Sequence, residues 1–150
     1  MDELDLKIIK ILSQNADVTA TEIKKIINLS IPAINKRIQN LKQRGYIKKF
    51  TIVMDEKKIG KPITAYISVV LKSDDFRPAL LEYVQKSDDI LECATVTGEY
   101  DYFLKVCAES IEQMDEIITD LKQRAGVAKS NTVFSLTNYK SEPTALPSVK

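Results

Sequence analysis

The chain contains 150 residues, 44% of them hydrophobic and 29% charged, with a formal net charge of +1, which is typical of one or two small globular domains. It has no histidine, no Walker loop and only four glycines. The commonest general base, the commonest transition-metal ligand and a glycine-rich phosphate cradle are therefore missing, and we expect neither a cofactor nor a metal site. No secretory apolar region and no apolar run of about 18 residues is present, so we expect a cytoplasmic protein without membrane contact.

The charge is divided unevenly along the chain. Residues 1–60 hold 12 Lys/Arg and 7 Asp/Glu, whereas residues 61–150 hold 10 and 14. A basic first part and an acidic second part indicate two modules with different partners.

The first module begins with two predicted helices. Apolar residues at helical spacing predict the first helix from about Asp2 to Ser13. Thr19 and Glu22 have the spacing of a capping box, which predicts the start of the second helix. The inner face of this second helix is predicted to comprise Ile23, Ile26 and Ile27.

A third helix follows, with Ser30 as its predicted N-cap, Pro32 in its first turn and Gly45 as its stop. Between Asn28 and Lys49 there are six cations and no acid. A cationic, amide-bearing third helix after a tight turn predicts a helix-turn-helix unit that binds double-stranded DNA, with cations on phosphates and amides on base edges. The competing interpretation is an ordinary solvated helix face. The residues expected to contact DNA are Ser30, Pro32, Asn35, Lys36, Arg37, Gln39, Lys42 and Gln43.

A strand and a linker are predicted to complete this module. The run from Tyr46 to Met54 is rich in Ile, Val, Phe, Tyr and Thr, which favours a strand. The charged segment from Asp55 to Lys61 is interpreted as the linker. We therefore expect a helix-turn-helix domain with its linker strand over residues 1–60, a second domain over 61–140 and a tail over 141–150.

The second module alternates strands and helices in the order β-α-β-β-α-β, which is the ferredoxin-like arrangement of an α+β fold. Its first helix is predicted to be capped by Asp74 and Asp75, and its second helix by a box of Ser110 and Gln113. The four strands are predicted at Ile63–Leu71, Ile90–Thr97, Tyr102–Ala108 and Val127–Asn138.

One face of such a sheet carries no helix, and it includes Tyr66 and Val70. A second copy of the same sheet is the simplest cover, so a homodimer is predicted. The strands also carry Cys93 and Cys107, which are interpreted as reduced, buried side chains. A redox role stays open because the two residues could be neighbours across one hairpin.

Three segments of the chain resemble the leucine-responsive/asparagine-regulator (Lrp/AsnC, or feast/famine) family of transcription factors. The segment from Leu29 to Lys48 resembles the helix-turn-helix of that family. The segment Val96–Lys105 is similar to its V-(S/T)-G-(D/E)-(Y/F)-D hairpin, and Gly126–Thr132 is similar to its entry into the last strand. The similarity covers roughly residues 2–138.

The resemblance implies a winged helix-turn-helix domain followed by a RAM/AsnC-type ferredoxin-like domain. It also implies a sequence-specific transcriptional regulator that forms dimers, tetramers or octamers and binds an amino-acid effector between dimers. The effector-binding residues that the matching positions imply are Gly98, Glu99, Tyr100, Asp101, Tyr102, Ser130 and Thr132.

Two other functions are weighed against this one. An architectural protein that coats DNA without an effector response would share the same DNA-binding helix. Haem-precursor decarboxylases resemble the family, but their chemistry is attributed partly to histidine, which is missing here, so we expect no enzyme activity.

Overall fold

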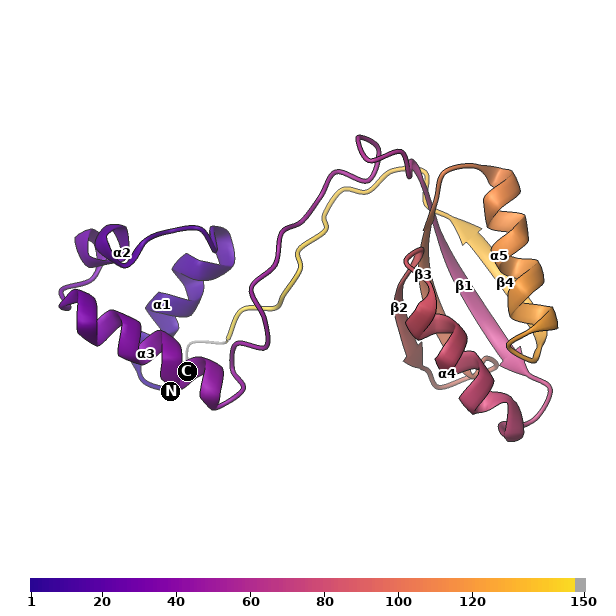
Figure 1. Ribbon diagram of the computed structural model, residues 1–150, viewed down its shortest axis with the longest axis horizontal. Coiled ribbons are helices and arrows are strands. Elements are labelled where there is room, and N and C mark those ends of the chain that lie inside the picture. The colour runs from indigo at the N-terminus through magenta and orange to yellow at the C-terminus, as the bar shows by residue number, and fades with distance from the viewer. Residues whose placement is uncertain (148–150) are drawn as a thin grey trace. The chain divides into compact units, whose positions relative to one another are not determined.

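A computed structural model describes residues 1–147, and it divides the chain into two compact units (Figure 1). The first unit comprises Met1–Val53 together with the described residues from Lys140 onward, and the second comprises Met54–Tyr139. Each unit has a separate hydrophobic core. No helix in the described part of the chain is long and apolar enough to cross a membrane.

The first unit contains the three predicted helices, α1 (Glu3–Gln14), α2 (Ala20–Ile26) and α3 (Ile31–Gln43). Local side-chain bonds start all three helices. A capping box joins Asp2 and Asp5 at α1, a second box joins Thr19 and Glu22 at α2, and the Ser30 hydroxyl accepts a bond from an α3 amide. The boxes satisfy amide groups that have no partner within the helix.

The core of this unit lies where the three helices meet. Ile26, which was predicted to face inward, is 65% exposed, so that prediction is wrong. The reason is that α2 ends at Ile26, and the extended backbone of Ile27 turns the following side chain into the core instead. The buried core residues are Ile8, Leu12, Ile23, Ile27, Ile34 and Leu41.

The strand predicted from Tyr46 to Met54 is wrong, because no strand is formed in this segment of the described chain. Gly45 ends the preceding turn with a φ of 75°, and the amide of Tyr46 donates to the carbonyl of Leu41 at 2.9 Å. Beyond this turn the apolar side chains stay exposed, including Ile52 at 78%. β-propensity alone does not make a strand, because the backbone groups need a partner strand to bond.

The second unit is a four-stranded antiparallel sheet with two helices, and its predicted β-α-β-β-α-β order is confirmed. The strands lie in the order β2-β3-β1-β4. The elements are β1 (Ile63–Leu71), a short 3-10 turn η1 (Asp74–Phe76), α4 (Arg77–Lys86), β2 (Ile90–Thr95), β3 (Tyr102–Ala108), α5 (Ile111–Gln123) and β4 (Val127–Phe134).

Four details differ from the prediction, and each has a local cause. Strand β2 ends earlier because the chain enters a hairpin, and β4 ends earlier because its pairing with β1 runs out at Phe134. The Asp74–Asp75 pair forms the 3-10 turn and caps nothing. The Gln113 side chain accepts from the Glu109 amide at 2.7 Å, so Ser110 caps α5 without a reciprocal box.

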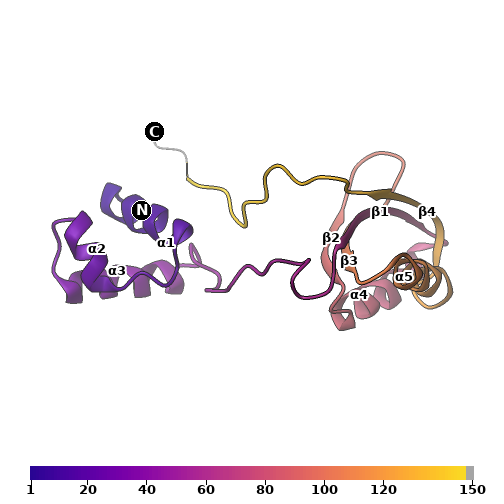
Figure 2. The same ribbon diagram turned by 90° about the horizontal axis from the view of Figure 1, so that it is seen from above.

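The two helices cover one face of the sheet and leave the other face open, as predicted (Figure 2). Residues Ala65, Ile67 and Val69 of β1 point into the core beneath the helices. On the open face, the rings of Tyr66 and Phe103 stack with their centroids 5.6 Å apart. The position of the helices therefore leaves an apolar surface exposed in the single chain.

The two cysteines lie on opposite faces of this sheet. Cys93 is paired with Leu104, whose side chain is in the core, whereas Cys107 is paired with Thr64 on the open side. Both are free thiols. They therefore cannot form a disulfide with each other within one chain.

Candidate DNA-binding surface and effector site

The outer face of α3 carries nearly all of the residues predicted to contact DNA. Its inner face is held by Ile34 and Leu41, which are buried against α1 and α2. The opposite face thereby projects cations and amides away from the core, as helical periodicity requires. The predicted residues that lie exposed on this side are Ser30, Pro32, Asn35, Lys36, Gln39, Lys42 and Gln43.

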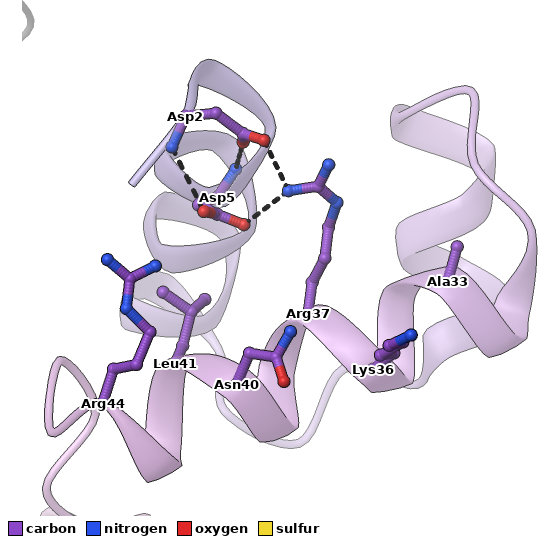
Figure 3. Close-up of a pocket in the computed structure, with 8 residues that line it drawn as sticks. All are labelled: Asp2, Asp5, Ala33, Lys36, Arg37, Asn40, Leu41 and Arg44. Carbon is purple, nitrogen blue, oxygen red and sulfur yellow. Dashed lines mark hydrogen bonds and ion pairs between the residues drawn. The ribbon is translucent and has the colours of Figure 1, made fainter.

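Arg37 is the exception among the predicted DNA contacts, because its side chain is half-buried and points towards α1 (Figure 3). Its Nη1 atom lies 2.7 Å from Asp2 Oδ2 and 2.7 Å from Asp5 Oδ1. Hydrogen bonds to Asp2 and Asp5 raise the pKa of the Arg37 guanidinium. The Asp5 amide and then Arg37 hold the pKa of Asp2 below its usual value.

An open hollow of about 410 Å³ lies beside this ion-pair cluster, between α1 and α3 (Figure 3). Lys36, Asn40 and Arg44 lie along its α3 side at a spacing of four residues. The guanidinium carbon of Arg44 lies 5.0 Å from the centroid of the Tyr46 ring. Asn40 and Arg44 were missed as candidate DNA contacts, although their i, i+4 spacing from Lys36 was the signal that could have found them.

Lys42 is also positioned by an aromatic side chain. Its Nζ atom lies 4.4 Å from the centroid of the Phe50 ring, within the range of a cation–π contact. This contact keeps the lysine stem against the segment that follows α3, while its residue stays exposed.

The hairpin between β2 and β3 contains the predicted effector residues Gly98 to Asp101. Gly98 has a φ of 111°, a conformation that strongly favours glycine. The amide of Val96 donates to the carbonyl of Asp101 at 3.1 Å and closes the turn. Glu99 is exposed at the tip.

Asp101 fastens this hairpin to β1. Its amide donates to the Val69 carbonyl at 2.9 Å, and its Oδ2 atom accepts from the Leu71 amide at 2.8 Å. The register between β1 and β4 shifts between Val70 and Leu71. The carboxylate of Asp101 therefore acts as the acceptor for an amide at an irregular end of the sheet.

A cation that the sequence pattern did not reveal lies beside the hairpin. Lys129 of β4 places its Nζ atom 5.3 Å from the centroid of the half-buried Tyr100 ring. Lys129 pairs with Val70, so it lies on the open side of the sheet. The family motif is variable at this position, and only the strand register brings Lys129 to the hairpin.

Three other predicted effector residues lie elsewhere. Tyr102 is 5% exposed and belongs to the core beneath the helices, so its ring does not form a wall of the hairpin surface. Ser130 pairs with Val69 and Thr132 pairs with Ile67, which places both on the helix-covered side of β4. The structure therefore brings Gly98, Glu99, Tyr100 and Asp101 together with Lys129, and separates them from this second group. Within residues 1–147, no cluster of three Cys, Asp or Glu side chains could hold a metal ion.

A cationic helix-turn-helix unit joined to a separate α+β unit defines a DNA-binding regulator with a second, ligand-binding domain. Residues 1–48 match the winged helix-turn-helix DNA-binding family. Residues 64–145 match the Lrp/AsnC ligand binding domain family. The chain belongs to the Lrp/AsnC family of transcriptional regulators.

Relatives along the full chain agree with this assignment. The chain is 33% identical to the HTH-type transcriptional regulator FL11 of Pyrococcus horikoshii, covering 98% of this chain and 96% of that protein. It is 34% identical to the transcriptional regulator AzlB of Bacillus subtilis, covering 93% and 91% respectively. These relatives are named as regulators of transcription and not as enzymes.

Solved structures have the same fold. The structure of Bacillus subtilis LrpC matches with a TM-score of 0.86 and 28% identity, covering 94% of this chain and 98% of that one. A transcriptional regulator of Neisseria meningitidis, crystallised as a complex with L-Met, matches with a TM-score of 0.91 and 24% identity. That match covers 97% of this chain and 96% of the other.

Proposed function

We propose that this regulator binds a two-fold DNA site as a homodimer and changes its assembly or DNA affinity when an amino acid binds at the β2–β3 hairpin. The observation that carries the proposal is the outer face of α3, where exposed cations and amides lie together over a segment without any acidic residue. The family assignment makes the chain a DNA-binding regulator, and the following points concern how it works.

The outer face of α3 has the chemistry for both kinds of DNA contact. Lys36 and Lys42 carry flexible cations suited to phosphates, and binding to phosphates weakens as salt rises. Asn35 and Gln39 carry amides that can pair with both the N6 and N7 positions of adenine in the major groove. We propose that α3 enters the major groove with this face towards the bases.

The open face of the sheet supports dimerisation. A sheet with helices on one side normally has its other side covered or solvated, and here that side carries the stacked Tyr66 and Phe103 rings and the 56% exposed Val133. We propose that two copies bury these faces against each other, and that dimers assemble further into tetramers or octamers. A dimer would present two α3 helices to half-sites about 34–36 Å apart or a multiple of that distance.

The hairpin supports recognition of a small zwitterion. The Gly98 backbone leaves the chain open to close approach, the Tyr100 ring offers an apolar wall, and the Lys129 ammonium is suited to a carboxylate. The Neisseria meningitidis regulator was solved with L-Met. A relative from Zymomonas mobilis, 30% identical over 98% of this chain, is named a glutamate uptake regulatory protein. We propose an amino acid as the effector here.

Regulation then follows from linkage. An effector changes the assembly state only by as much as its affinity differs between the two states, so tight binding without such a difference regulates nothing. The architectural alternative shares the DNA-binding helix but lacks this differential affinity.

Two measurements test the proposal. We expect the protein to bind a selected duplex more tightly than a random-sequence duplex, and Gln39→Ala to change the preferred sequence. We also expect one or more of the twenty amino acids, at millimolar concentration, to raise the melting temperature and change the assembly mass. If no duplex binds at low salt, the DNA role is wrong, and if no amino acid shifts either quantity, the architectural function is favoured.

A further inference from the structure

We propose that Arg37 does not contact DNA but positions α3, because it clamps the middle of that helix to the first turn of α1 through Asp2 and Asp5. In this arrangement the cationic contacts along this flank of α3 come from Lys36 and Arg44. The inference rests on the proposed DNA-binding function, and it changes which cation has which role.

The clamp is built on a pair of carboxylates that are already held in place. Asp2 Oδ1 accepts from the Asp5 amide at 2.8 Å, and Asp5 Oδ2 accepts from the Asp2 amide at 3.1 Å. This capping box aims the remaining oxygens, Asp2 Oδ2 and Asp5 Oδ1, towards α3, where the single Nη1 atom of Arg37 meets both at 2.7 Å (Figure 3). Little further ordering is needed to form both ion pairs.

Burial keeps Arg37 in this position. Asp5 is the one charged residue in the described chain that is buried, with 8% exposure. If Arg37 turned outward to reach a phosphate, the Asp5 carboxylate would lose its cation while still largely removed from water. Leaving a buried charge without its partner is strongly unfavourable. Arg37 therefore stays bound to α1 when α3 meets DNA.

The neighbouring cations lack such a constraint. Lys36 and Arg44 are exposed, and neither forms an ion pair with an acidic side chain anywhere in residues 1–147. With Asn40 they form a row on the outer side of the hollow, whereas Arg37 projects across to α1 (Figure 3). The clamp also neutralises two carboxylates that would otherwise repel phosphates next to this row.

The first test compares salt dependence and sequence preference. The probes are a 30-base-pair duplex that the wild-type protein selects from a random pool and an unselected duplex of equal length, with binding measured by fluorescence anisotropy. Removing one cation that neutralises a phosphate should lower the slope of log affinity against log salt by about 0.9. We expect that decrease for Lys36→Gln and Arg44→Gln.

Arg37→Gln should behave differently. We expect its salt slope to equal that of the wild type, and its preference for the selected duplex to fall on the order of tenfold, the size of one misplaced base contact. Affinity for the unselected duplex should stay close to that of the wild type, which a general loss of folded protein would not allow. A slope lower by about 0.9 for Arg37→Gln overturns the inference.

Asp5→Asn gives a second test, in which a clamp and a phosphate contact predict opposite signs. This change keeps an oxygen for the capping box but removes the ion pair to Arg37. A clamp predicts weaker binding to the selected duplex, although the change removes a negative charge near DNA. If Arg37 contacted phosphate, releasing it would tighten binding, and that result overturns the inference.

Glu3→Gln is the matched control, because it removes a negative charge from the same turn at an exposed residue. We expect it to bind as tightly as the wild type or more tightly. All variants are assayed well below their melting temperatures, which circular dichroism gives. A wild-type protein that binds neither duplex contradicts the proposed function itself, whereas the outcomes above separate the two roles of Arg37.

Discussion

At the scale of single residues, Gly126 occupies a place that no other residue fits. Its φ is +69°, and a Cβ atom there would lie 2.2 Å from two carbons of the Phe76 ring. Its carbonyl accepts from the Lys72 amide at 2.9 Å, which fixes the backbone. The glycine at the start of β4 is therefore required by packing as well as by backbone conformation.

We predict that Gly126→Ala lowers the free energy of unfolding by roughly 1–3 kcal/mol, because strain in the left-handed region adds to a steric clash. Urea denaturation measures the change. In a Phe76→Ala background the steric part is removed, so the same substitution should cost less. An equal cost in both backgrounds would show that the ring contributes nothing.

Asp2 predicts a pH dependence of stability. Its pKa is lowered in the folded state from the model-compound value of 3.8, because the Asp5 amide and Arg37 favour the charged form. The stabilisation is therefore present above the unfolded pKa and is lost as the pH falls through the lower, folded pKa. Asp2→Asn keeps a good N-cap but lacks the charge.

We expect the melting temperature of Asp2→Asn to be below that of the wild type at pH 7, and the difference to vanish in acid below the folded pKa. The comparison cancels the other carboxylates with lowered pKa values, which are Glu22, Glu82 and Glu112. A difference that is the same at both pH values would mean that the Asp2 charge is not the cause.

The sequence allowed the caps to be predicted, because Thr19 and Glu22 interact over three residues. It did not reveal the role of Arg37, whose partners lie 32 and 35 residues away. Amphipathic spacing placed Arg37 on the flank of α3, and only the packing of α1 against α3 directs it inward. Contacts between distant segments set the part of the site that could not be predicted.

At the scale of elements, Asp101 connects the hairpin to the sheet, and this suggests a mechanical role distinct from ligand contact. We predict that Asp101→Ala increases hydrogen exchange of the Leu71 amide and of the hairpin closed by Val96, because the carboxylate that accepts from Leu71 is removed. A buried amide left without a partner costs about 1–3 kcal/mol, and Leu71 is 8% exposed.

Asp101→Asn is the control, since its amide oxygen can still accept from Leu71. We expect its exchange rates to stay near those of the wild type. Unchanged protection of Leu71 in Asp101→Ala would show that the side chain does not fasten the hairpin, and Asp101 would then remain a candidate for effector contact.

The element order was predictable because period-two alternation in β1 and the helical stripe of α5 are local signals. The strand predicted from Tyr46 to Met54 failed because pairing is not local. The family motif likewise grouped Ser130 and Thr132 with the hairpin, whereas strand register sets them on the other face of β4. Pattern gives the elements, but pairing decides which side chains share a surface.

At the scale of the whole molecule, the open face of the sheet is the surface through which copies would pair. A charge at Phe103, which is 37% exposed and stacked on Tyr66, would be buried without a partner in such a dimer. We predict that Phe103→Asp is monomeric in sedimentation velocity at concentrations where the wild type is dimeric. Leu81→Asp, at a 41% exposed apolar residue of α4 on the helix side, should remain dimeric.

The same variant measures what pairing contributes to DNA binding, because Phe103 belongs to the second unit and the α3 surface of the first is left unchanged. Joining two DNA-binding units makes the second binding event intramolecular, which can raise affinity by about 10²–10⁴ without any new contact. Phe103→Asp should therefore weaken binding to a two-fold site by roughly that factor and binding to a single half-site much less, measured on duplexes of equal length. If both duplexes weaken equally, the substitution has acted on α3 or on folding, and the open face is not what brings two recognition helices together.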